Sequence, residues 1–178
     1  MGFFSKDKVT LDQLAKVLAD MVFKSLFETS FEAYKTLLRY VKESEDINAR
    51  QKREVLVFEM LAATRAVSKT FTNPIEAKEL LDKFHAKIYD MVSYPEDEQL
   101  NFENFVTERY QTYYKILELK EKNMMFLFGK RFADYLLNKD VGGSGLFLIV
   151  SSAEIFTSNI ENSSNLIKDI LSKFELSK

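Results

Sequence analysis

Residues 54–67 read EVLVFEMLAATRAV and are apolar at most positions. After Glu54, only Glu59, Thr64 and Arg65 interrupt the apolar side chains. A helix that is hydrophobic around nearly its whole circumference has to be surrounded by other elements. We therefore predict a helix that runs through the middle of the fold, with Glu59 in an environment that contains little water.

Both flanks of this stretch carry apolar residues at helical spacing. Thr10-Leu11-Asp12-Gln13 has the pattern of a capping box and predicts the start of the first helix. A kink or a short break is expected near Ser30. Asn73-Pro74-Ile75-Glu76 ends the central helix and opens the next one, because asparagine caps helices and proline suits the first helical position. The predicted helical patterns cover residues 11–26, 31–41, 54–67, 74–92, 102–117, 125–137, 146–159 and 164–174.

The composition agrees with a compact helical protein. The chain has 178 residues, which suits one domain, and its five glycines and two prolines leave little material for turns. We expect an all-α, single-domain helical bundle of about six to eight helices. The stretch SYPEDE at residues 93–98 predicts the start of the helix that contains the aromatic residues of the range 102–117.

Charge and cysteine content exclude several classes of function. The net charge of −2 gives no overall attraction to nucleic acid, so we expect no nucleic-acid partner. The absence of cysteine excludes disulfides, thiolate metal sites and cysteine nucleophiles, and it is compatible with a reducing cytoplasm, where we expect the protein. The longest strongly apolar run, Leu146–Val150, is far shorter than a membrane span, so we expect a soluble protein without a transmembrane segment.

Three of the five glycines lie in the short segment GGSG at residues 142–145. A phosphate-binding loop of the Walker type needs a lysine where Leu146 stands, so we interpret the segment as a left-handed helix stop followed by a flexible joint. The expected organisation is a tail over residues 1–9, a bundle over 10–141, a glycine hinge over 142–145 and a helical arm over 146–178. The arm is too apolar to stay in water, so it packs on its own bundle or exchanges with a partner chain in a homodimer.

Candidate ligand-binding residues come from the interior of the predicted bundle. Glu59 lies among apolar residues, and a buried carboxylate must pair or take up a proton. Arg109 occupies a matching position on the fifth helix, one turn before Tyr113. The sequence leaves two alternatives open. The first is a structural ion pair between Glu59 and Arg109, supported by a tyrosine, and the second is the polar floor of a ligand pocket.

His85 is the only histidine of the chain, and Asp82 precedes it by three residues. It is expected either to be a boundary residue tied to a carboxylate or to act as a ligand oriented by Asp82. The eight residues LDKFHAKI are similar to the globin segment around the iron-binding histidine, and this resemblance implies haem as an alternative cofactor. No second histidine is present for the distal position, so we do not assign the chain to that family, and no cofactor is our first expectation.

No convergent catalytic set emerges from the sequence. One histidine cannot supply a di-iron or histidine-rich zinc site, and no nucleophile elbow surrounds the serines of the range 151–164. We therefore expect a non-enzymatic helical protein that acts through protein–protein contacts or self-association. The alternative is a domain that binds a small molecule or haem in a cavity near His85.

Overall fold

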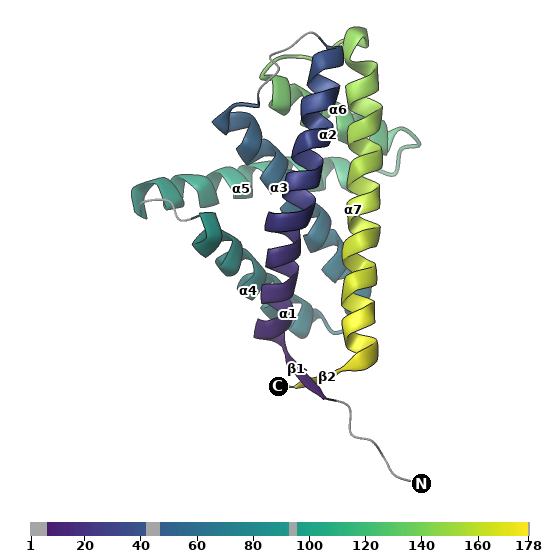
Figure 1. The fold of residues 1–178 in the computed structure, drawn as a ribbon. Helices are drawn as coiled ribbons and strands as arrows, with labels where there is room; N and C mark the ends of the chain where they lie inside the picture. Colours follow the sequence, from purple (N-terminus) through teal and green to yellow (C-terminus); the bar gives the residue numbers. More distant parts are fainter. Residues whose placement is uncertain (1–6, 42–46, 93–95, 178) are drawn as a thin grey trace.

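The computed structural model of the chain describes residues 7–41, 47–92 and 96–177. These residues form the predicted all-α bundle, with one short sheet added (Figure 1). The predicted tail up to residue 6 and the predicted start of the fifth helix at residues 93–95 lie outside the described residues. The helices are α1 Leu11–Asp20, α2 Phe27–Tyr40, α3 Ala49–Thr70, α4 Pro74–Val92, α5 Glu96–Leu117, α6 Met124–Leu137 and α7 Leu146–Lys173.

The central position predicted for residues 54–67 is confirmed. Within α3, every residue from Glu54 to Thr64 is buried. The helix packs against α7, α6, α4 and α2, which together cover this stretch on all sides. In Figure 1 the rod formed by α1 and α2 runs beside α7, while α4 and α5 extend to one side.

An aromatic cluster occupies the centre of the core. The ring of Phe58 on α3 lies 3.9 Å from that of Phe132 on α6 and 5.1 Å from that of Phe156 on α7, measured between centroids. Tyr34 on α2 and Tyr113 on α5 meet the same ring edge-on. Rings in such arrangements contribute about 0.5–1.5 kcal/mol a pair beyond the area that they bury. The single side chain of Phe58 thus contacts four other helices.

Of the kink or short break predicted near Ser30, the break is absent. The helix continues from Leu11 to Tyr40, and its irregularity is a π-helical segment, Met21–Leu26, between α1 and α2. Ser30 is buried within α2, where its hydroxyl lies 3.4 Å from the side-chain amide of Asn159. A serine that meets a polar partner in the interior does not need to cap a helix end.

The C-terminal segment is one helix and not two. The residues between the two predicted helices lie inside α7, where Ser163 and Ser164 are buried against the bundle. Serine and asparagine favour helix ends in isolation, but tertiary packing overrides such a weak local preference. In the described structure α7 lies along α3 and α6 of its own chain, and exchange with a second chain stays a prediction.

The glycine segment also differs from the prediction. The left-handed residue after α6 is Asn138, with φ of 53°, and none of the described glycines has a positive φ. Gly143–Gly145 form a single 3₁₀ turn that leads directly into α7. Gly145 is required for another reason, because a Cβ atom there would overlap the Val141 side chain.

The two ends of the described chain meet in a parallel pair of short strands. Strand β1, Lys8–Thr10, pairs with β2, Glu175–Ser177, so that Val9 is opposite Leu176. The last two residues of the predicted tail therefore belong to the folded body. Among the described residues, no helix is long and apolar enough to cross a membrane.

Candidate functional site

Glu59 lies in a sealed part of the core between α2, α3 and α7. Its side chain is fully buried, and Oε2 accepts a hydrogen bond of 2.6 Å from the Asn159 amide. Oε1 has no hydrogen-bond partner among the described residues. Burial raises the pKa of Glu59 to about 8, although hydrogen bonds from Ser30 and Asn159 act in the opposite direction. The carboxyl group is therefore mainly protonated at neutral pH.

Arg109 pairs with Glu54, and the predicted pair with Glu59 is not formed. The Arg109 Nε and Nη2 atoms donate to the Glu54 carboxylate over 3.0 and 2.8 Å. The guanidinium also stacks on the Tyr135 ring, 3.8 Å from its centroid. Glu54 and Glu59 are five residues apart, so they project from α3 roughly 140° apart around its axis. Only the residue on the α5 side can reach Arg109.

Tyr113 contributes to the aromatic core and not to a pocket. It is fully buried, and its ring lies 5.1 Å from that of Phe128. The hydroxyl has no hydrogen-bond partner among the described residues, and burial raises its pKa well above the ordinary value. Arg109 and Tyr113 are neighbours on α5 that both contact the Tyr135 ring, but only Arg109 takes part in an ion pair.

His85 belongs to a hydrogen-bonded chain between α4, α5 and α3. Its Nδ1 lies 2.7 Å from the Leu81 carbonyl oxygen, and its Nε2 lies 3.1 Å from the Tyr110 hydroxyl, which in turn is 3.2 Å from the Thr64 hydroxyl. A carbonyl can only accept, so Nδ1 carries the hydrogen. Burial lowers the pKa of His85, which favours the neutral ring, with Nε2 accepting from Tyr110.

The hydrogen bonds of the His85 ring determine whether this residue can act as a ligand. The residue lines a hollow of about 440 Å³ at the start of α4, but both ring nitrogens are already engaged. An iron or another metal could bind Nε2 only if Tyr110 moved away, so the residues present do not fit an axial haem ligand. Asp82 does not orient the histidine, because its carboxylate binds Lys78 at 2.6 Å. His85, Glu59, Arg109 and Tyr113 form no common site.

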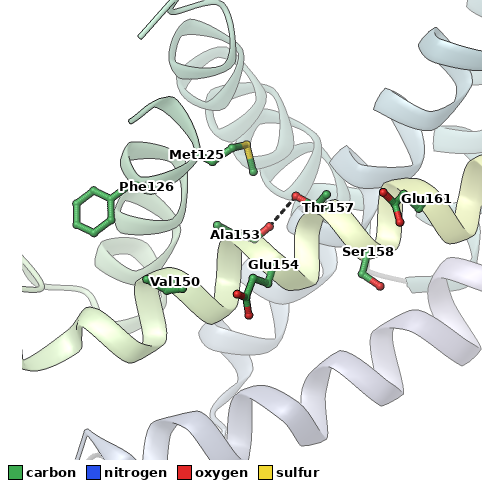
Figure 2. A pocket seen from close by; sticks show the side chains of 8 residues that line it. All are labelled: Met125, Phe126, Val150, Ala153, Glu154, Thr157, Ser158 and Glu161. Carbon is green, nitrogen blue, oxygen red and sulfur yellow. Dashed lines mark hydrogen bonds between the residues drawn. The ribbon is translucent and has the colours of Figure 1, made fainter. Parts of the chain in front are cut away.

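A groove between α6 and α7 is the best candidate for a functional surface (Figure 2). Its volume is about 500 Å³, within the range of binding sites for ligands and peptide side chains. Phe126 and Val150 are 40% and 42% exposed, so two apolar side chains of the groove are open to water. The lining residues are Met125 and Phe126 of α6 and Val150, Ala153, Glu154, Thr157, Ser158 and Glu161 of α7.

Gly129 explains how the two helices that form the groove come together. A Cβ atom at this position would overlap the carbonyl oxygen of Ile149 and touch the Ala153 side chain. The backbones of α6 and α7 therefore meet closely at Gly129. One turn earlier on α6 stand Met125 and Phe126, which form that helix's side of the groove.

Two carboxylates stand beside the apolar surface of the groove. Glu154 and Glu161 are both exposed on α7, and neither takes part in an ion pair within the described part of the chain. The Thr157 hydroxyl between them donates to the Ala153 carbonyl oxygen over 2.9 Å (Figure 2). The groove thus offers apolar contacts and unpaired negative charge.

Sequence reasoning missed this groove. Phe126 and Val150 belong to helices whose other apolar residues fill the core, and spacing alone does not show which apolar side chain is left uncovered. The one available signal was the segment LFLIV at residues 146–150, in which all five side chains are apolar. A helix with one buried face needs apolar side chains only on that face, so some of these five had to be exposed or covered by something else.

Comparison with known proteins adds no assignment. No protein-family model, curated protein or solved structure matches the chain. Among the described residues, no group of three or more histidine or acidic side chains could hold a metal ion. The contacts of the groove are therefore the best guide to function.

Proposed function

We propose that the protein is a non-enzymatic binding module whose α6/α7 groove accepts an amphipathic α-helix of a partner protein. One observation carries this proposal: the groove combines exposed apolar side chains, Phe126 and Val150, with the unpaired carboxylates of Glu154 and Glu161. A partner with an apolar face and flanking lysine or arginine residues complements both features.

The length of the groove suits a helical ligand. Its α7 side runs from Val150 to Glu161, which is about 16 Å along the helix axis, or three turns. A helix that packs alongside can place an apolar residue on this surface at each turn, in the helix-in-groove mode of peptide recognition.

The groove residues favour binding over catalysis. The Thr157 hydroxyl is already used within its own helix, and the groove contains no histidine, lysine or arginine that could serve as a base or stabilise an oxyanion. Glu154 and Glu161 are exposed, so they lack the dry surroundings that make a carboxyl group a general acid.

The other functional expectations have weaker support. Homodimerisation by exchange of α7 would have to replace contacts that this helix already makes with α3 and α6. A ligand at His85 would have to compete with the Tyr110 hydroxyl for Nε2. The cytoplasm remains the proposed location, since a chain without cysteine suits a reducing compartment.

The proposal is tested by selection from a library of displayed helical peptides against the purified chain. We expect the selected peptides to be amphipathic, and we expect their binding to be lost when Phe126→Ser and Val150→Ser are combined. Ile75→Ser is the matched control, because Ile75 is an apolar side chain that is 75% exposed on α4, outside the groove. Peptides that bind the double variant as well as the original chain would overturn the proposal.

A further inference from the structure

The exposed face of α7 carries a regular order of side chains. Phe147, Glu154, Glu161 and Lys168 follow one another every seven residues, and all four are exposed. Seven residues make nearly two helical turns, so these side chains form one column with a small drift around the axis. From the start of α7 the column reads aromatic, acidic, acidic, basic.

The hollowed surface beside this column extends past the groove into a second hollow. A second hollow of about 280 Å³ lies between α3 and α7, and Glu161 lines both hollows. Lys168 and Lys69 stand at the second hollow, and neither takes part in an ion pair within the described ranges. At the other end, the exposed Phe147 ring packs edge-on against Tyr40, 5.6 Å between centroids.

Resting on the proposed function, we infer that the partner helix carries a complementary heptad column. Basic residues seven positions apart lie opposite Glu154 and Glu161, an acidic residue lies opposite Lys168, and an apolar residue meets the aromatic pair of Phe147 and Tyr40. Flanking charges at heptad spacing choose partners and orientation in paired helices, while the apolar seam supplies most of the affinity.

The same charges disfavour a second copy of this chain as the occupant. A twofold axis centred on the groove makes an isologous contact, in which Glu154 of each copy lies opposite Glu161 of the other. Two pairs of like charges would then face each other across the interface, which is unfavourable. The partner is therefore a different protein with a basic helix.

Two synthetic helical peptides of about 25 residues, long enough for three heptads, test the inference. Both have the same composition and apolar face. The matched peptide has the order apolar, basic, basic, acidic at heptad spacing, and the shuffled peptide exchanges the acidic residue with the first basic one. Fluorescence anisotropy with the full chain is expected to show about five- to tenfold tighter binding of the matched peptide, and the preference shrinks at high salt.

A charge exchange makes the test specific. The variant Glu154→Lys/Glu161→Lys should prefer a peptide in which both matching lysines are replaced by glutamate. Because both glutamates are exposed, the variant should fold, and its circular dichroism and melting temperature verify this.

The outcomes separate the two proposals. Equal affinity for the matched and shuffled peptides, with both lost in the Phe126→Ser/Val150→Ser variant, overturns the charge column and leaves the groove as a helix site. Binding of neither peptide, together with a failed library selection, overturns both proposals. A dimer in light scattering that the variant Phe126→Ser/Val150→Ser abolishes would identify a second copy as the occupant and overturn the inferred partner.

Discussion

Glu59 shows most clearly how a single buried side chain can reduce the stability of this fold. A buried carboxyl group with one unpaired oxygen is expensive in its charged form, so it keeps its proton. Asn159 and Ser30 supply neutral dipoles, and no cationic side chain bonds the group in the described structure.

The stability of the protein should fall as the pH rises through neutrality. The pKa of Glu59 is raised from 4.5 to about 8, so the native state holds a proton that the unfolded state releases. The free energy of unfolding is expected to fall by about 1.4 kcal/mol per pH unit from this residue between its unfolded and folded pKa values. Urea unfolding of the original chain and of Glu59→Gln across this range measures the difference.

The amide of Glu59→Gln does not titrate, so this variant should lack that part of the slope and gain relative stability at alkaline pH. Glu154→Gln is the control, because it makes the same chemical change at an exposed carboxylate. Equal slopes for Glu59→Gln and the original chain would show that Glu59 is not protonated in the native state.

At the scale of elements, α7 closely approaches its neighbours at two glycines. The backbones of α6 and α7 touch at Gly129, and Gly145 makes room for Val141. Gly142 and Gly143 have open space where a Cβ atom would stand, and Gly142 has φ of −78°, which any residue adopts. Two of the three glycines in the predicted hinge are thus not required by the observed conformation.

Gly129→Ala is expected to destabilise the protein by about 1–3 kcal/mol, because the added methyl group forces α6 away from α7. Gly142→Ala is the matched control. It should leave the free energy of unfolding unchanged or raise it by up to about 1 kcal/mol, since alanine restricts the unfolded chain. Urea unfolding at one pH measures both, and equal stabilities of the two variants would contradict the close helix contact.

At the scale of the molecule, α7 packs on the bundle of its own chain and forms part of the core. It buries Leu148, Ile149, Phe156, Ile160 and Ile167, and Phe156 closes the aromatic cluster around Phe58. Each such side chain contributes about 1.5–3 kcal/mol when fully buried. Their sum is comparable to the whole stability of a typical domain, about 5–15 kcal/mol.

A chain that ends at Val141 should therefore lose cooperative unfolding, whereas a chain that ends at Lys173 should keep it. The longer variant lacks only β2, whose removal leaves the helical core intact. Circular dichroism during urea titration distinguishes the two. Cooperative unfolding of the shorter chain would contradict the contribution of α7 to the core.

The sequence predicted the helical class and several helix ends because these depend on neighbouring residues. Thr10 and Gln13 form their capping box at the observed start of α1, and the Asn73 side chain accepts from the Ile75 amide at the start of α4. The burial of α3 followed from its own apolar circumference. The candidate site was not predictable in this way, because the groove is a surface that neighbouring helices happen to leave uncovered.

The sequence by itself therefore determined local features. It showed where helices form, which helix must be buried, and that Glu59 would lie in an environment with little water. The tertiary structure alone decided that Arg109 reaches Glu54, that α7 continues through its serines, and that Phe126 and Val150 stay exposed. Hydrogen bonds three or four residues apart are specified by the chain itself. Contacts between residues 50 or 100 positions apart depend on helix orientation, which all the packed side chains set together.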